Sequence, residues 1–280
     1  MTKKGKNRKG FFLFNAVFSL VSYVIRLLFP PKCVICNNML LKENELCETC
    51  LPLWESARRA KCPVCHKTAR ACICRTFHMT DTDSVGDRSI SALGFYKKFG
   101  SDDPVDRLVL RLVTAVKTRE EKSAIRFCAR ELSHEILKTF ILDGRSTADW
   151  RITFPPRSKK RVRKYGFDHG KELCKYISKY TGIRYQQTLT NSAVLSQKHL
   201  NSLERKKNAD SSYRIRKKTK IEGNYIVVDD IVTTGATINA VASALKSAGA
   251  GSVYPVCIAK TKKKKRRLRR PAERPWFTAK

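Results

Sequence analysis

The fold of this chain is decided by the stretch NYIVVDDIVTTGAT, which occupies residues 224–237. Residues 226–228 form a continuous apolar run, which is typical of a strand buried on both faces of a parallel sheet. Two adjacent carboxylates, Asp229 and Asp230, follow the run, and a helical pattern extends from Ala236 to Ala248. The order predicts a strand, a short polar loop and the N-terminus of a helix.

The loop between this strand and this helix has the features of a phosphate site. Backbone N–H groups at a helix N-terminus point outward without partners, and the helix dipole adds positive potential. Thr233, Thr234 and Thr237 add hydroxyl donors, and Gly235 allows close backbone approach. An ordinary turn capped by Asp or Thr is the simpler alternative. The paired acids, paired threonines and glycine in register are more specific than that alternative.

The composition is normal for a globular protein except in its charge. The 280 residues carry a formal net charge of +34. Both ends are basic, but residues between them hold more than half of this charge. Such a field attracts polyanions, namely nucleic acid, anionic lipid or phosphorylated substrates. A lysine-rich composition throughout the source organism is the alternative.

The cysteines predict metal sites in a reducing cytoplasm. Eight of the eleven cysteines fall between Cys33 and Cys74, without the pattern of a secreted disulfide scaffold. Paired CxxC knuckles supply the four thiolates of a structural zinc ribbon. The second group ends in a less standard CxC, so we expect one or two zinc ions; His66 and His78 are interpreted as surface residues. The expected ligands are Cys33, Cys36, Cys47 and Cys50, then Cys62, Cys65, Cys72 and Cys74.

The remaining N-terminal and C-terminal segments are read from composition. Residues 1–31 comprise a basic start and an apolar helix at 11–29, which packs on the protein or lies on a membrane surface. A single N-terminal membrane anchor is the alternative. The zinc-ribbon module is expected at 32–78 and a polar linker at 79–88. A basic disordered tail is expected at 261–280.

Residues 89–260 alternate strand and helix patterns, which predicts an α/β domain with a parallel sheet. Asp103 and Pro104 are a typical start for the first of its helices, since an acid caps it and proline suits the first turn. Apolar residues recur at helical spacing and are interpreted as core. We expect strands at 89–96, 151–154, 184–189 and 252–259, and helices at about 123–140 and 168–180.

A strongly basic loop at 155–169 follows one of these strands. Crevices at strand ends bind ligands in α/β folds, and Arg or Lys there could grip a diphosphate. Arg157 and Arg163 are the candidates. A solvated basic loop is the alternative. Residues 196–208 are expected to form a polar surface lobe.

The stretch at 224–237 closely resembles the phosphoribosyl-diphosphate (PRPP) signature of type I phosphoribosyltransferases. Residues 25–260 together resemble the ComF family of competence-associated, phosphoribosyltransferase-like proteins. Four matches carry this resemblance: Leu28-Phe29-Pro30-Pro31 before the cysteine ribbon, the strand ending at Tyr96 with its following helix, the spacing of Gln197, Arg205 and Asn208, and residues 227–237.

The resemblance implies a type I phosphoribosyltransferase fold, a parallel sheet flanked by helices, with a small N-terminal double zinc-ribbon module. It implies that Asp229 and Asp230 bind the ribose hydroxyls of PRPP, accompanied by Mg²⁺. It also implies that Thr233, Thr234, Gly235, Ala236 and Thr237 cradle the 5′-phosphate. The implied role is DNA uptake during natural transformation, handling single-stranded DNA in the cytoplasm beside the uptake helicase and processing proteins.

The basic loop departs from the family pattern. The family has Arg-Gly-Phe-Asn-Gln where this chain has Tyr165-Gly166-Phe167-Asp168-His169. Asp168 would repel a diphosphate if it pointed inward, which argues against turnover more than against PRPP binding. Two hypotheses follow: an active phosphoribosyltransferase, or a non-catalytic zinc-ribbon scaffold that binds single-stranded DNA and uptake-machinery proteins. The acceptor base and the oligomeric state are left open.

Overall fold

The computed structural model describes residues 28, 30–40, 44–74, 89–97, 101–118, 121–191 and 213–262. The linker expected at 79–88 and the lobe expected at 196–208 lie outside these residues, as do most of the start expected at 1–31 and of the tail expected at 261–280. Within the described residues, no helix is both long and apolar enough to cross a membrane. Lys262, which follows the last strand, pairs with the buried Asp106 at 2.5 Å between Nζ and Oδ1.

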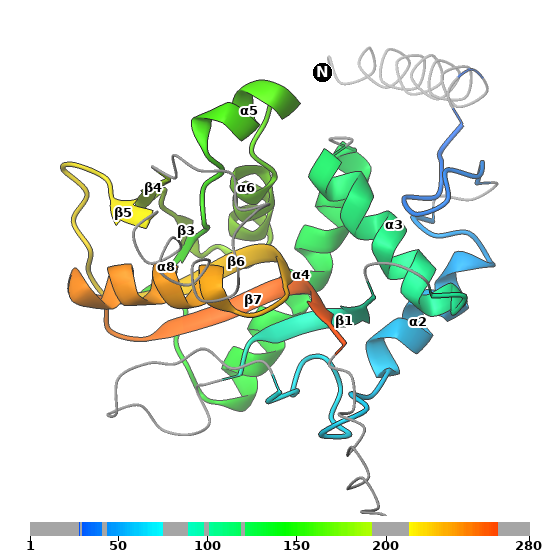
Figure 1. The fold of residues 1–280 in the computed structure, drawn as a ribbon, viewed down its shortest axis with the longest axis horizontal. Coiled ribbons are helices and arrows are strands. Elements are labelled where there is room, and N and C mark those ends of the chain that lie inside the picture. The colour runs from blue at the N-terminus through cyan, green and yellow to red at the C-terminus, as the bar shows by residue number, and fades with distance from the viewer. Residues whose placement is uncertain are drawn as a thin grey trace, which may run out of the picture.

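A five-stranded parallel sheet forms the centre of the molecule, in the order β1-β7-β6-β2-β3 (Figure 1). Its central strands are long apolar runs, as expected for strands covered on both faces. A separate antiparallel pair joins β4 to β5. The strands are β1 (Ser91–Tyr96), β2 (Trp150–Thr153), β3 (Arg184–Tyr185), β4 (Leu189–Asn191), β5 (Tyr213–Ile215), β6 (Asn224–Val232) and β7 (Val253–Thr261).

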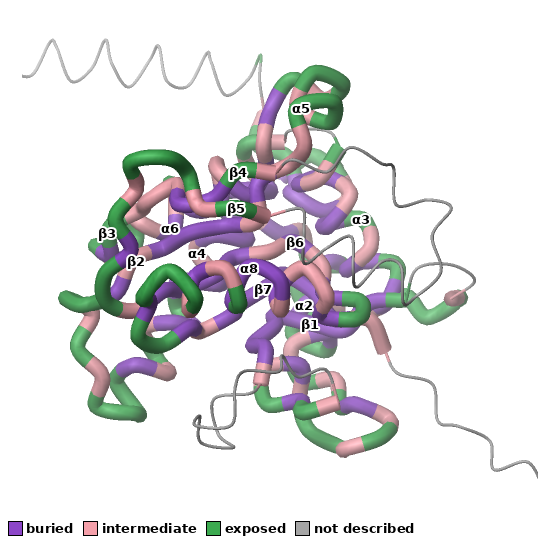
Figure 2. Tube along the Cα trace, turned by 60° about the vertical axis from the view of Figure 1, so that its left-hand side comes forward, coloured by how far each residue is buried: buried purple, intermediate pink, exposed green. Residues whose placement is uncertain are grey.

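Helices cover both faces of the sheet. Figure 1 shows α8 in front of β6 and β7, with α4 and α6 behind them, and Figure 2 shows the central strands as the most buried part of the chain. Each face has its own apolar core. The helices are α2 (Cys50–Arg59), α3 (Pro104–Thr118), α4 (Lys122–Leu142), α5 (Lys159–Tyr165), α6 (His169–Thr181) and α8 (Ala236–Ser247).

This architecture confirms the predicted type I phosphoribosyltransferase fold, and most predicted elements fall within a few residues of their observed bounds. The cap of α3 is confirmed, since Val105 N donates to Asp103 Oδ1 at 2.9 Å. Strand β6 continues beyond the apolar run through both acids to Val232. Therefore Asp229 and Asp230 lie within the strand rather than in the loop that follows.

Two predictions of local structure are wrong. The strand expected at 184–189 is two short strands in different sheets, because β3 pairs with β2 while β4 pairs with β5. Between them the buried Thr188 hydroxyl meets the Thr153 hydroxyl at 2.7 Å, a contact that alternation of apolar residues does not reveal. The basic loop at 155–169 contains the helix α5, which ends at Gly166 with a positive φ of 78°.

The cysteine-rich module contains two knuckles with the same backbone geometry. Asn37 N donates to Cys33 O at 2.9 Å, and His66 N donates to Cys62 O at 3.0 Å, with both donors at positive φ. An isolated bridge closes each knuckle, Lys32 to Met39 and Lys61 to Thr68. The second group is thus built like the first, although its remaining cysteines are spaced differently.

The module packs against both faces of the sheet at its β1 edge. Cysteines of the first group share a core with α3 and α4, and cysteines of the second share the core under α8. A buried ionic network adds to this packing. Glu135 on α4 accepts from Arg58 Nη2 at 2.8 Å and pairs with Arg70 at 2.5 Å. Arg58 follows the first cysteine group and Arg70 lies within the second, so a single buried carboxylate ties both groups to α4.

Candidate functional site

Strand β6 carries the two acids to the edge of the sheet where the loop to α8 begins. Asp230 is buried, with 5% of its surface exposed, and Asp229 is half-buried. Asp230 N donates to Asp229 Oδ1 at 2.8 Å, and Ile231 N donates to Asp230 Oδ1 at 2.6 Å. Each acid is therefore fixed through one carboxylate oxygen by the next backbone amide.

The loop after the acids has the arrangement expected of an anion cradle. Thr233 and Thr234 are exposed, and Gly235, with a φ of 85°, is the N-cap of α8. Ala236 N donates to Thr234 Oγ1 at 3.4 Å, and Asn239 N donates to Gly235 O at 2.9 Å. N–H groups in a first helical turn lack intrahelical acceptors, so this loop points donors at its exposed side.

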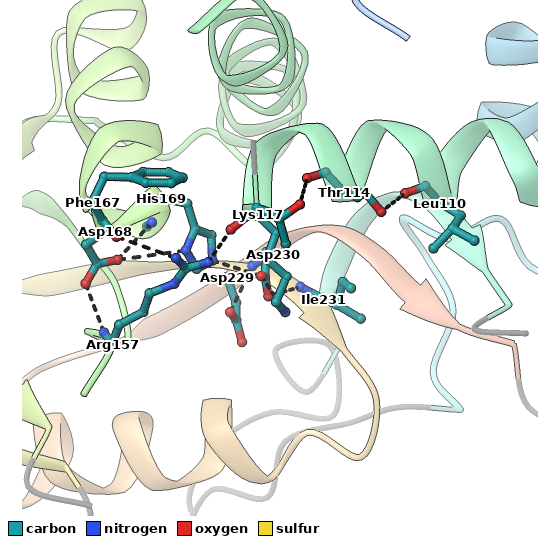
Figure 3. A network of polar contacts seen from close by, with 12 residues as sticks. Leu110, Thr114, Lys117, Arg157, Phe167, Asp168, His169, Asp229, Asp230 and Ile231 are labelled. Carbon is teal, nitrogen blue, oxygen red and sulfur yellow. Dashed lines mark hydrogen bonds and ion pairs between the residues drawn. The ribbon is translucent and has the colours of Figure 1, made fainter. Parts of the chain in front are cut away.

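Two side chains from outside the signature converge on Asp230. Lys117 Nζ and His169 Nε2 each lie 2.8 Å from Asp230 Oδ2, from the end of α3 and the start of α6 (Figure 3). Sequence reasoning missed both residues. Lys117 lies beside the apolar residues of α3, whose helical spacing predicts only a buried face. The departure from the family pattern at residue 169 was the available signal for His169.

The environment separates the two neighbouring acids electrostatically. Burial and the charge of Asp230 raise the pKa of Asp229 to about 8. Burial alone would also raise the pKa of Asp230, but the hydrogen bond from His169 and the charge of Lys117 outweigh it and lower that pKa well below its usual value. At neutral pH the pair holds one negative charge, located on Asp230.

Arg157, a predicted diphosphate ligand, instead contacts other residues of the protein through its guanidinium group. Its Nη2 donates to Lys117 O at 2.7 Å, and its guanidinium carbon lies 5.0 Å from the Tyr165 ring centre and 5.4 Å from that of Phe167. Burial lowers the pKa of Arg157. The guanidinium joins the end of α3 to the basic segment and thereby helps to place Lys117.

The departures from the family pattern have defined partners. Asp168 caps α6 by accepting from Gly170 N at 3.1 Å, and it also accepts from Arg157 N at 2.9 Å. Its carboxylate is therefore held by backbone amides. Tyr165 stacks on Arg157, and His169 pairs with Asp230. Arg163, the other predicted diphosphate ligand, is exposed on α5.

The structure brings together the four sulfur atoms of each cysteine group. In both groups the ligand atoms lie within 4.8 Å of one another, and all eight cysteines are free. Sulfur pairs at 3.6 Å (Cys36 and Cys47), 3.8 Å (Cys62 and Cys74) and 3.6 Å (Cys65 and Cys72) match the edge of a zinc–thiolate tetrahedron, about 3.8 Å for Zn–S bonds of about 2.3 Å. We call them the first tetrad (Cys33, Cys36, Cys47 and Cys50) and the second tetrad (Cys62, Cys65, Cys72 and Cys74). Both could hold zinc.

The donor chemistry of the second tetrad also suits a metal. Burial would raise the pKa of Cys65, but hydrogen bonds from the Lys67 backbone and from the neighbouring thiols lower it to about 6. The thiolate is the form that binds metal. His66 is exposed and turned out at the knuckle, as expected for a residue outside the ligand set, and His78 lies outside the described residues.

Comparisons with known proteins agree with this fold. A model described as the phosphoribosyl transferase domain matches residues 181–277. The chain is 29% identical over 153 residues to DNA utilization protein YhgH of Salmonella typhimurium, and 26% identical to the protein of that name from Escherichia coli. Each match covers 54% of this chain and 66% of the relative, just under two thirds of its length.

Solved structures give looser overlaps. A hypoxanthine phosphoribosyltransferase from Trypanosoma cruzi shares 18% identity over 54% of this chain and 70% of its own, with a TM-score of 0.33. One from Staphylococcus aureus shares 13% over 51% and 65%, with a TM-score of 0.32. The fold assignment rests instead on the sheet, the signature loop and the matched domain.

The central parallel sheet, the two acids on its middle strand and the matched domain together define a protein of the phosphoribosyltransferase type. Within that class, the cysteine tetrads before the domain and the relatives named for DNA utilization distinguish it further. These features support the resemblance to the ComF family that the sequence indicated.

Proposed function

We propose that this chain binds PRPP with Mg²⁺ at the loop between β6 and α8. Asp229 and Asp230 hold the ribose hydroxyls, and Thr233, Thr234, Gly235, Ala236 and Thr237 hold the 5′-phosphate. The observation that carries the proposal is the placement of both carboxylates on the central strand, next to the loop with the exposed Thr233 and Thr234 that leads into α8. Mg²⁺ would neutralise the diphosphate and ribose oxygens when the ligand is bound.

Lys117 and His169 act on this site through Asp230. They keep its carboxylate ionised and oriented before the ligand arrives, because both lie 2.8 Å from the same oxygen. A ribose hydroxyl that donates to Asp230 must therefore share a carboxylate oxygen that already has a partner, or displace Lys117 or His169. For transfer of the phosphoribosyl group, we propose Arg163 as the residue that faces the diphosphate. Arg157 is not proposed for this role, because its guanidinium donates to Lys117 O.

The test is calorimetric titration of zinc-loaded protein with PRPP and Mg²⁺, beside the double variant Asp229→Asn/Asp230→Asn. The double variant removes the negative charge of the pair, which would strengthen non-specific attraction of so anionic a ligand. Loss of binding in the variant would therefore identify specific contacts to the ribose. The matched control Asp102→Asn/Asp149→Asn removes two exposed acids and should keep wild-type affinity. No binding by the wild type refutes the proposal.

A second candidate function, a non-catalytic scaffold for single-stranded DNA and uptake-machinery proteins, is favoured by an exposed basic surface. Within the described residues, none of the exposed lysines and arginines of α5 and of residues 214–218 forms an ion pair with an acid. Burial raises the pKa of Tyr213 and the charge of Arg161 partly opposes this, so α5 lies near β5. Figure 2 shows α5 exposed at the rim. The surface comprises Lys159, Lys160, Arg161, Arg163 and Lys164 on α5, with Arg214, Arg216, Lys217 and Lys218 at β5.

Salt dependence and charge-matched variants separate the two functions. Binding of a single strand should weaken with salt by a log–log slope of about 0.7 for each phosphate contacted. Lys160→Gln/Lys164→Gln should lower DNA affinity and reduce that slope, while Lys175→Gln/Lys179→Gln on exposed α6 positions should not. The Asp229→Asn/Asp230→Asn variant should retain DNA binding. Equal losses in both lysine pairs would refute a localised DNA surface.

We also propose, from the resemblance to the ComF family and from relatives named for DNA utilization, that the chain acts in DNA uptake. The proposed setting is the cytoplasm, with residues 11–29 touching the inner face of the membrane. The proposed organisation is the one expected from sequence: a zinc module at 32–78, a linker at 79–88 and the phosphoribosyltransferase-like domain at 89–260. Fractionation of cells, with and without residues 1–31, tests the membrane contact, which is refuted if both forms stay in the soluble fraction.

A further inference from the structure

One lysine is buried where no carboxylate pairs with it. Lys260 lies on β7 with 0% of its surface exposed, and of the described lysines and arginines it alone is fully buried. Its Nζ donates to Cys72 O at 2.9 Å. Within the described chain no ion pair joins Lys260 to an acid. A buried ammonium without a counter-charge is costly, by several kcal/mol in real proteins.

The negative charge that can balance Lys260 is the second tetrad. Four thiolates around one Zn²⁺ carry a net charge of about −2. Cys72 is a member of that tetrad, and the other members share its core with β7 residues such as Cys257. The first tetrad has no buried lysine or arginine in the described residues, although its knuckle has the same geometry. The two tetrads therefore share one knuckle geometry but differ in their electrostatic surroundings.

We propose that Lys260 is the internal counter-cation of the second tetrad, and that metal at this tetrad is what makes its burial on β7 stable. Lys260 is a positioning residue, because it contacts a ligand's carbonyl and not the metal. The proposal rests on zinc occupancy of the tetrad and is independent of PRPP binding. Lys260 pairs in register with Val232 at the end of β6, two residues beyond Asp230. Metal loss would leave an unbalanced cation next to the proposed ligand loop.

The test measures metal affinity of each tetrad separately. Cobalt replaces zinc and reports thiolate ligation by its absorption, and a competing chelator gives the affinity. A Cys33→Ser/Cys36→Ser chain reports the second tetrad, and a Cys62→Ser/Cys65→Ser chain reports the first. Lys260→Met should weaken cobalt binding at the second tetrad by about 10–100-fold and leave the first unchanged. The control Lys61→Met, at an exposed lysine next to Cys62, should change neither.

A second variant and a stability measurement keep the outcome decisive. Lys260→Gln retains a donor for Cys72 O without the charge, so it should weaken cobalt binding as Lys260→Met does. If Lys260→Gln behaves like the wild type, the hydrogen bond alone matters and the proposal is wrong. Lys260→Met should destabilise the metal-loaded chain in urea but stabilise the Cys62→Ser/Cys65→Ser chain, where the lysine is uncompensated. A change of the same sign in both chains also overturns the proposal.

Discussion

The clearest prediction concerns Asp229, whose environment favours the protonated acid. Asp229→Asn replaces that acid with a neutral side chain of the same shape. In the unfolded chain an aspartate has a pKa of about 3.9, whereas burial and Asp230 raise the folded value to about 8. Between these values the folded wild type holds one proton more than its unfolded chain. Its stability therefore falls as pH rises, and the variant lacks this dependence.

The size of the effect follows from the single proton. One extra proton in the folded state changes the unfolding equilibrium constant tenfold per pH unit. The wild type should lose about 3 kcal/mol relative to Asp229→Asn between pH 5 and pH 7, and the difference should level off above pH 8. Asp230 does not oppose this, because its lowered pKa keeps it ionised over the whole interval; its contribution is lost only as pH falls toward 4 and below.

Urea unfolding of both zinc-loaded proteins at half-unit steps from pH 5 to pH 8.5 measures the difference. Asp149→Asn, which changes an exposed acid in the same way, controls for the general effect of removing a carboxylate. A difference between wild type and Asp229→Asn that stays constant with pH would refute the assignment of the proton to Asp229. A difference that moves in the wild type's favour as pH rises would refute it equally.

Three further perturbations test the packing around the site. A Cβ on Gly170 would lie 2.7 Å from the buried Phe154 ring, so Gly170→Ala should lower the free energy of unfolding in urea by about 1–3 kcal/mol. Gly94→Ala should lower it less, because a Cβ there would lie 3.5 Å from Val109. Equal losses of stability would contradict this. Glu135→Gln should lower the free energy of unfolding by about 1–3 kcal/mol, because it removes the carboxylate that pairs with Arg58 and Arg70. Glu55→Gln, in an exposed pair with Arg59, should change it by less than about 0.5 kcal/mol. A larger loss in Glu55→Gln than in Glu135→Gln would refute the tie of the module to α4. Removing metal with a chelator should speed amide hydrogen exchange in α2 and β1 more than in β2; uniform exchange would mean that the tetrads do not stabilise that edge.

The sequence was sufficient for the elements whose signals are local. The apolar run before Asp229, the Asp103 cap and the cysteine spacings each act within a few residues, and the structure places each as predicted. The strand at 184–189 failed because its residues divide between two sheets, and strand pairing is a long-range property. Helix α5 was missed because a run of cations gives no amphipathic pattern to recognise.

The lysine that pairs with Asp230 could not have been found from a sequence pattern. Lys117 lies 113 positions from Asp230 in sequence and reaches it only because α3 ends over the edge of β6. Arg157 fixes that end by donating to Lys117 O, which accounts for an arginine that sequence reasoning had assigned to a ligand. Long-range contacts of this kind depend on how helices pack on the sheet, and no local pattern in a single sequence marks them.

The position of the cysteine module gives it a consequence for the ligand site. Its two tetrads hold opposite faces of the sheet at β1, and β1 pairs with β7, which pairs with β6. Lys260 joins the second tetrad to the end of β7, opposite Val232 on β6. Two adjacent strands, rather than a linker, thus lie between the second tetrad and the proposed ligand loop. If that path transmits strain, loss of the second metal should weaken PRPP binding more than loss of the first, and titration of the two cysteine-to-serine chains decides it. Equal affinities would show that β7 is rigid enough to isolate the loop from the module.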